Sequence, residues 1–117
     1  MEQEDAILAL AALAQSTRLE VFRLLVQHEP DGLLAGDIAR SLGVPHNTMS
    51  SHLAILARAR LVVSERQSRT VTYRANLTRV NEFVTFLLKD CCAGSPVVCR
   101  PVLAAITPCC APERTDA

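Results

Sequence analysis

All five cysteines of this 117-residue chain lie after residue 90, and the first 90 residues contain none. They form two adjacent pairs and one single residue, namely Cys91 and Cys92, Cys99, and Cys109 and Cys110. Ligation by thiolates alone favours soft or thiophilic ions over Mg, Ca and Mn. An odd number of cysteines, in a chain that begins without an export signal, argues against a disulfide framework. The cluster therefore predicts a soft-ion site or thiol redox chemistry.

The arginines form a second group whose chemistry suggests a function. Residues 40–79 carry seven arginines and a single acid, Glu65, which gives a net charge of +6. Residues 1–39 carry −5 and residues 80–117 carry −1, so the whole chain is neutral. A basic block between acidic flanks is typical of a nucleic-acid surface on a neutral protein. The alternative is an ordinary solvated surface, which the scarcity of compensating acids disfavours.

The elements that must position these groups are mainly helical. The chain has three Phe, one Tyr and no Trp, which predicts an aliphatic core. Apolar periodicity and helix breakers predict helices over residues 5–14, 16–28, 34–42 and 45–59, and a last one from residue 77 or 78. The first is apolar almost all round, so we expect a partner subunit to cover it. The second is expected to start with a cap at Ser16-Thr17 and to bury one face, formed by Leu19, Phe22, Leu25 and Val26.

Two β-branched runs, residues 61–63 and 70–74, flank Arg66–Arg69 and predict a hairpin with a basic tip. This order of elements is that of a winged helix-turn-helix, a mainly α fold with a small β-hairpin. Its second helix presents N-terminal residues to base edges in the major groove. The candidate DNA-binding residues are His46, Asn47, Thr48, Ser50, Ser51, Arg58, Arg66 and Arg69. Helix capping is the alternative role for Asn47, Thr48 and Ser50.

Two segments resemble the ArsR/SmtB family of metal-responsive repressors. Residues 12–19 (ALAQSTRL) resemble the family opening ALADPTRLxIL, and residues 48–56 (TMSSHLAIL) resemble its recognition-helix signature xxSxHLxxL. The resemblance covers about residues 6–92. It implies a homodimer that pairs through its first and last helices and binds double-stranded operator DNA. It also implies that His52 belongs to the helix packing rather than to a metal site.

The chain departs from the family pattern at two glycine positions. Arg60 stands where the family often has Gly before the wing, and Ser68 stands where Gly is common at the wing tip. A non-glycine residue at positive φ is strained by roughly 1 kcal/mol. We therefore expect the end of the recognition helix to take another geometry.

The resemblance also implies where an inducer site is absent and where one is expected. Arsenic-responsive members usually carry Cys-Val-Cys where this chain has Leu34-Ala35-Gly36, and the last helix lacks the ligands of the zinc, nickel and cobalt sensors. Members with C-terminal arsenic sites have an adjacent cysteine pair followed by a third. As(III) favours three sulfurs, so we expect Cys91, Cys92 and Cys99 to bind it, with Cys109 and Cys110 as additional candidates. Sb(III) and methylated arsenic are alternative inducers.

Other readings of the cysteines stay open. Four thiols could hold Zn or Cd, although the chain has no Cys-x-x-Cys pair. A redox or persulfide switch is a second option, with only Lys89 and Arg100 as nearby cationic support. A thiol enzyme is disfavoured because no base lies near the cysteines in the sequence. A constitutive DNA-binding protein with an inert tail is the simplest alternative.

The sequence predicts two parts, a DNA-binding and dimerisation domain over residues 1–93 and a Cys/Pro-rich sensing tail over residues 94–117. The early apolar run at residues 6–14 is too short to span a bilayer. Acids precede the first base, Arg18, which is the opposite of a secretory leader. We therefore expect a cytoplasmic protein without a membrane partner.

Overall fold

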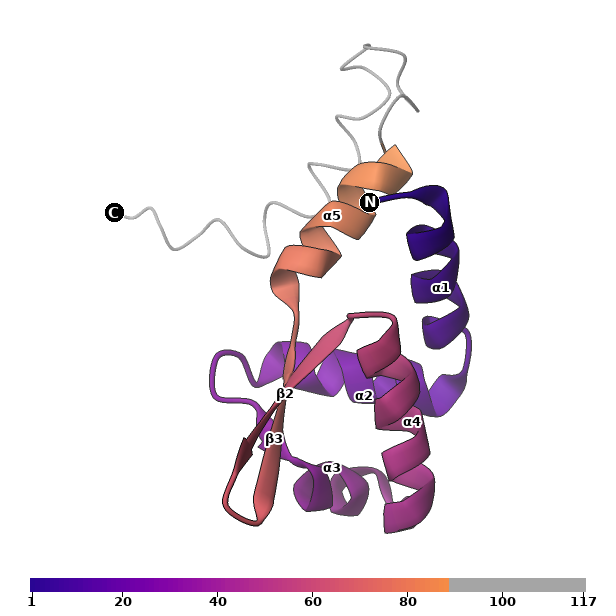
Figure 1. The fold of residues 1–117 in the computed structure, drawn as a ribbon. Helices are drawn as coiled ribbons and strands as arrows, with labels where there is room; N and C mark the ends of the chain where they lie inside the picture. Colours follow the sequence, from indigo (N-terminus) through magenta and orange to yellow (C-terminus); the bar gives the residue numbers. More distant parts are fainter. Residues whose placement is uncertain (89–117) are drawn as a thin grey trace, which may run out of the picture. The chain divides into compact units, whose positions relative to one another are not determined.

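Five α-helices and three short β-strands make up residues 1–88, the part of the chain that the computed structural model describes. The helices are α1 (Gln3–Leu13), α2 (Ser16–Gln27), α3 (Ala35–Leu42), α4 (His46–Arg58) and α5 (Leu77–Leu88). The strands are β1 (Leu33–Leu34), β2 (Val62–Gln67) and β3 (Thr70–Ala75). Residues 1–83 form one compact unit. The predicted winged helix-turn-helix is confirmed (Figure 1).

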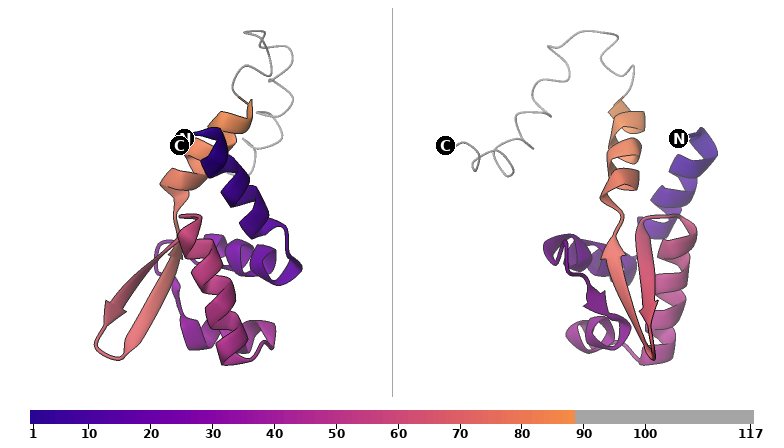
Figure 2. Two further views of the ribbon diagram at one scale, coloured as in Figure 1. Left: turned by 45° about the vertical axis from the view of Figure 1, so that its right-hand side comes forward. Right: turned by 60° about the vertical axis from the view of Figure 1, so that its left-hand side comes forward.

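The sheet is antiparallel, with the strand order β1-β3-β2. The left view of Figure 2 shows β2 and β3 extending from the helices as a two-stranded arm, the predicted wing. The strand β1 was not predicted, because two residues are too few for a visible alternation. Leu34 is extended and pairs with Thr72 of β3. The third helix therefore starts at Ala35, one residue later than predicted.

The core is aliphatic, as the composition predicts. Its largest fully buried side chains come from α2, α3, α4 and the segment after α4: Val21, Leu25, Ile38, Met49, Leu53, Leu56 and Leu61. The inward positions predicted for α4 are confirmed. The buried face predicted for α2 is partly wrong, because Leu19 and Val26 are 43% and 40% exposed. The cap of α2 is also one residue earlier than predicted, since Gln15 Oε1 accepts a hydrogen bond from the Arg18 backbone N–H (2.8 Å).

The fully buried side chains of helix α1 are all small. Its buried residues are Ala6, Ala9 and Ala12, whereas its large apolar side chains point outward. Ile7, Leu8 and Leu10 are 54%, 43% and 48% exposed. A chain of this size rarely leaves such a contiguous apolar face in water unless something covers it. Among residues 1–88, no helix is long and apolar enough to cross a bilayer.

The end of α4 contradicts the expectation for Arg60. Arg60 adopts φ +65°, the left-handed conformation that glycine would favour. The Leu61 N–H donates to the Leu56 carbonyl (3.0 Å) and the Arg60 N–H donates to the Ala57 carbonyl (2.9 Å), which together form a Schellman motif. Asn76 Nδ2 also donates to the Arg60 carbonyl (2.9 Å). These hydrogen bonds offset a strain of about 1 kcal/mol, so the family geometry persists without glycine.

Candidate nucleic-acid interface

The turn between α3 and α4 sets the direction of the helix that is expected to read DNA. Gly43 ends α3 with φ +64°, and the Val44 N–H donates back to the Ala39 carbonyl (3.0 Å). Pro45 is extended, and its carbonyl accepts from the Met49 N–H (2.9 Å) in the first turn of α4. Because Met49 is buried, the opposite side of this first turn is held toward the solvent.

All five polar residues predicted at the start of α4 are exposed: His46, Asn47, Thr48, Ser50 and Ser51. Helix α4 contains no acidic residue, so nothing within it repels a phosphate. Asn47 Oδ1 accepts from the Thr48 N–H (2.9 Å) within the first turn of α4, but the N-cap position itself is held by Pro45. The Ser51 hydroxyl lies 3.5 Å from the Asn47 carbonyl. The surface is thus a set of short hydrogen-bonding groups able to meet bases or phosphates.

The structure separates the predicted arginines. Arg69 lies at the wing tip beside Ser68, which has φ +57°. Arg66 lies within β2, opposite Val71, and is therefore not a tip residue as the sequence suggested. Arg58 lies in the last turn of α4, about 18 Å along the axis from His46 at 1.5 Å per residue. Both Arg58 and Arg66 are exposed, but neither joins the group around the start of α4.

A cleft of about 330 Å³ brings the wing tip and the helix-turn-helix together. Arg69 and Thr70 line it from the wing, His46 from α4, and Arg40 and Asp37 from α3. Arg40 was not predicted as a site residue, although it is the first arginine of the basic block. Its side chain is 75% exposed and forms an ion pair with Asp37. Two arginines and a histidine, from α3, α4 and the wing, thus border one cleft together with Asp37.

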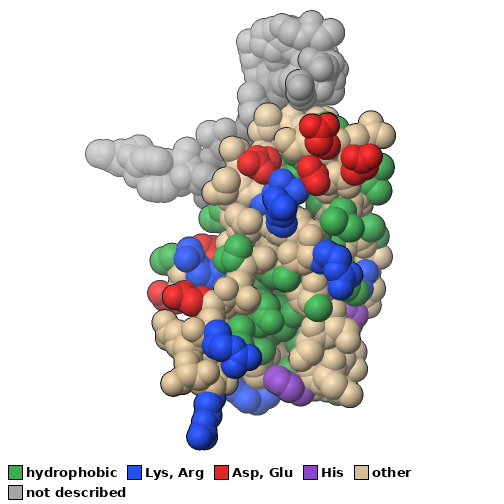
Figure 3. All heavy atoms as spheres, viewed as in Figure 1, with side chains coloured by type: hydrophobic (Ala, Val, Ile, Leu, Met, Phe, Trp, Pro, Cys, Tyr) green, Lys and Arg blue, Asp and Glu red, His purple; other side chains and the backbone are tan. Residues whose placement is uncertain are grey.

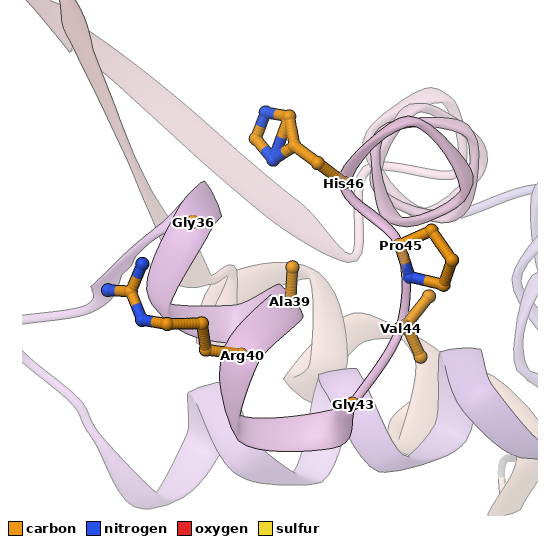
Figure 4. Close-up of a pocket in the computed structure, with 7 residues that line it drawn as sticks. All are labelled: Gly36, Ala39, Arg40, Gly43, Val44, Pro45 and His46. Atoms are coloured by element: carbon orange, nitrogen blue, oxygen red, sulfur yellow. The ribbon is translucent and has the colours of Figure 1, made fainter.

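A second hollow, of about 440 Å³, lies between α3 and the start of α4 (Figure 4). Small residues, Gly36, Ala39 and Gly43, form much of its lining, and Arg40 and His46 border it. Figure 4 shows Ala39 and Arg40 on α3 and His46 at the start of α4. The small side chains leave room for a bulky group to approach the turn, and the two polar side chains flank that approach.

Acidic and basic side chains are unevenly distributed over the compact unit. Acidic side chains gather at the start of α1, where Glu2, Glu4 and Asp5 lie (Figure 3). At the end that holds α3 and the wing tip, the same view shows basic and histidine side chains. The asymmetry that the sequence predicts is therefore present on the folded surface, and it favours an anionic partner at the α3–α4–wing end.

The predicted metal ligands Cys91, Cys92, Cys99, Cys109 and Cys110 lie outside the described residues. So do the predicted helix end after Lys89 and the predicted domain boundary at residues 93 and 94. Within residues 1–88, no three or more His, Cys, Asp or Glu side chains form a group that could hold a metal ion. His52, assigned to packing by the resemblance, faces Arg18, with 3.4 Å between Nδ1 and Nη1.

The comparisons with known proteins agree with this geometry. A family model described as a helix-turn-helix domain matches residues 13–65. The transcriptional activator HlyU of Vibrio cholerae is 30% identical over 90 residues, which cover 77% of this chain and 81% of HlyU. A structure of V. cholerae HlyU has a TM-score of 0.61 at 30% identity and covers 79% of this chain and 99% of that one. Another structure of V. cholerae HlyU is described as reduced.

Two further solved structures share the fold. An ArsR-like transcriptional regulator from Rhodococcus sp. RHA1 has a TM-score of 0.65 at 26% identity, and the match covers 92% of this chain and 93% of that one. A winged helix-turn-helix domain from Mycobacterium bovis, described as homodimeric, has a TM-score of 0.59 at 24% identity. The match covers 74% of this chain and 81% of that one. The relatives are regulators of transcription and not enzymes. The chain belongs to the ArsR-type family of helix-turn-helix transcriptional regulators.

Proposed function

We propose that the protein is a homodimeric transcriptional repressor that binds operator DNA and is released by trivalent arsenic. The observation that carries the DNA-binding part is the cleft bordered by Arg40, His46 and Arg69, next to the exposed polar start of α4. The start of α4 would enter the major groove and read base edges. The two arginines and the histidine of the cleft would contact the phosphates that flank it and fix the orientation of α4.

The apolar face of α1 supports a homodimer. Ile7, Leu8 and Leu10 are roughly half exposed in the single chain. Burial of a whole Leu or Ile side chain is worth about 1.5–3 kcal/mol, so a second copy that covers three of them gains considerable free energy. The M. bovis domain of similar fold is described as homodimeric. A dimer would present two copies of α4 to the two half-sites of a palindromic operator.

The arsenic part depends on the sequence. The five cysteines are confined to residues 91–117, and residues 1–88 contain no alternative group of metal ligands. As(III) bound by Cys91, Cys92 and Cys99 would favour a dimer geometry that fits the operator less well. A coupling free energy of about 1–3 kcal/mol, or 5–150-fold in affinity, is usual for such linkage.

The test is a titration of DNA affinity with arsenite. A 30-base-pair duplex is first selected from a random pool by the wild-type protein, and its affinity is measured by fluorescence anisotropy with and without arsenite. Wild type is expected to lose 5–150-fold in affinity, whereas Cys91→Ser binds the duplex normally and does not respond. Ser95→Ala, a change near the cysteines that removes no thiol, is the matched control. Loss of DNA binding by Cys91→Ser without arsenite would show that the cysteine is structural.

A thiol-redox response is the second candidate. The supporting observation is that one HlyU structure is described as reduced, so the oxidation state was specified for a relative 29% identical to this chain. The same titration with hydrogen peroxide, a persulfide donor, zinc and cadmium separates the candidates. Release by an oxidant that dithiothreitol reverses, together with indifference to arsenite, would replace arsenic by a redox signal.

A further inference from the structure

Arg18 joins the end of α1 to the middle of α4. It lies in the first turn of α2, where Gln15 fixes its backbone. Its Nε donates to the Ala12 carbonyl (2.6 Å), and its Nη2 lies 3.5 Å from the Ala11 carbonyl. Its Nη1 lies 3.4 Å from Nδ1 of His52, which is 34 residues away in the sequence. One half-buried guanidinium thus contacts two other helices.

The contact with the Ala12 carbonyl satisfies a backbone group at the end of α1, whereas the Ala11 carbonyl also accepts from the Ala14 N–H (3.2 Å). The last four carbonyls of a helix have no partner within it, and a cation near them also interacts favourably with the helix dipole. Ala11 and Ala12 belong to the last turn of α1. Arg18 therefore acts as a side-chain cap, which ties the end of α1 to α2.

In the contact with His52 of α4, only one direction of the hydrogen bond is chemically possible. A guanidinium carries five donors and no acceptor, so Nδ1 of His52 must accept and the ring proton must lie on Nε2. An amide oxygen at the same position can also accept, so glutamine reproduces the acceptor and alanine removes it.

His52 lies directly behind the surface that is expected to meet bases. It follows the exposed Ser51, and it is one helical turn after the exposed Thr48, on the same side of α4. At the other end of the link, α1 presents its uncovered apolar residues to the proposed partner subunit. Through its contacts with Ala12 and His52, Arg18 thus connects α1, the helix proposed to form the dimer, with α4, the helix proposed to bind the major groove.

We propose that Arg18 is a positioning residue for operator recognition, which acts through His52 to hold α4 in register with α1. The proposal rests on the proposed DNA-binding function. It identifies a residue through which sequence-specific DNA binding would depend on the dimer. Arg18 does not itself touch DNA in this scheme. Its loss is expected to weaken binding to the specific sequence, which needs both reading helices in place, and to spare the phosphate contacts that any duplex offers.

The experiment compares two duplexes and five variants of the full chain. The duplexes are the 30-base-pair sequence selected from a random pool by wild type and a scrambled sequence of the same composition. Arg18→Ala and His52→Ala are expected to lose about tenfold in affinity for the selected duplex, the size usual for a hydrogen bond to a charged group. Both are expected to bind the scrambled duplex within about twofold of wild type. His52→Gln is expected to keep specific binding, and Arg18→Ala/His52→Ala to lose no more than Arg18→Ala.

His28→Ala is the matched control, because the His28 side chain, at the C-terminal cap of α2, hydrogen-bonds only to the Leu24 carbonyl among the described residues (2.9 Å). His52→Gln and His52→Ala leave the α1 cap intact, so the pair remains informative even if Arg18→Ala unfolds. Full specific affinity in His52→Ala, or equal losses on both duplexes, would overturn the positioning role alone. Failure of wild type to enrich any sequence from the pool would overturn the proposed function instead.

Discussion

Nη2 of Arg79 lies 3.5 Å from Oδ1 of Asp5, so the first turn of α5 and the first turn of α1 are joined by an ion pair. The Arg79 side chain is only 10% exposed, and its Nη1 also lies 3.1 Å from Oε1 of Glu82. Its Nε is buried and has no hydrogen-bond partner within residues 1–88. A cation so enclosed depends on its carboxylates, and Asp5 is the one that comes from another helix.

Acid should weaken the fold through Asp5. The backbone N–H of Glu2 donates to Asp5 Oδ2 (3.0 Å), and this hydrogen bond, followed by Arg79, lowers the pKa of Asp5 below its ordinary value. A lowered folded-state pKa gives stability that is present above the unfolded value of about 3.9 and is lost as the pH falls through the folded pKa. We expect the urea midpoint of wild type to decrease as the pH drops below about 4. The decrease should be smaller in Asp5→Asn. Glu4→Gln, at an exposed neighbour, should follow wild type. The same decrease of the urea midpoint in acid for Asp5→Asn and Glu4→Gln would refute the role of Asp5.

Gly32 and Gly43 should differ in their tolerance of a methyl group. Both have positive φ, +75° and +64°, which costs a non-glycine residue about 1–2 kcal/mol. A Cβ at Gly32 would also lie 2.5 Å from the Tyr73 carbonyl, whereas a Cβ at Gly43 has nothing within 4 Å. In urea unfolding, Gly43→Ala should lose about 1–2 kcal/mol and Gly32→Ala clearly more. Equal losses would mean that the chain at Gly32 can withdraw from β3.

Arg60→Gly should stabilise the protein. Glycine removes the strain of φ +65° while keeping both backbone hydrogen bonds of the α4 end. We expect a gain of up to about 1 kcal/mol in the free energy of unfolding. Ala57→Gly, three residues earlier inside the helix, should lose about 1 kcal/mol instead. Two losses would indicate that the Arg60 side chain itself stabilises the fold.

The basic cleft should reveal itself in the salt dependence of DNA binding. Arg40→Ala and Arg69→Ala are each expected to reduce the slope of log affinity against log salt by about 0.9, the value for one lost phosphate contact. The loss should be similar for selected and scrambled duplexes, because phosphates carry no sequence information. Arg23→Ala changes an exposed arginine of α2 that does not line the cleft and should leave the slope unchanged. An unchanged slope in Arg40→Ala would remove Arg40 from the interface.

Much of the fold was predictable because its signals are local. The buried stripe of Met49, Leu53 and Leu56 follows the helical period, and Pro45 marks the start of α4. The errors have tertiary causes. Leu19 and Val26 are as apolar as Leu25, and only the packing of α2 decides which of them is buried. Leu34 is extended because β3 lies beside it, a contact between residues nearly forty positions apart that no periodicity reports.

The candidate site was predictable at α4 and incomplete elsewhere. The polar start of α4 follows from its exposed face, but Arg40 joins His46 and Arg69 only through the closeness of α3 to the wing tip. Arg58 and Arg66 share the same basic block, yet the helix and strand geometry carries them away from that group. Charge counted along a sequence locates a basic segment, whereas the fold decides which of its members act together.

The confinement of every thiol to residues 91–117 has a practical consequence for spectroscopy. A maleimide dye or spin label would attach to this sequence only at residues 91–117, outside α1 to α4 and the wing. No engineered cysteine is needed, and no group on the surface of those elements is altered. The unmodified amino-acid sequence therefore offers built-in handles for following the tail while helices α1 to α4 and the wing keep their native chemistry.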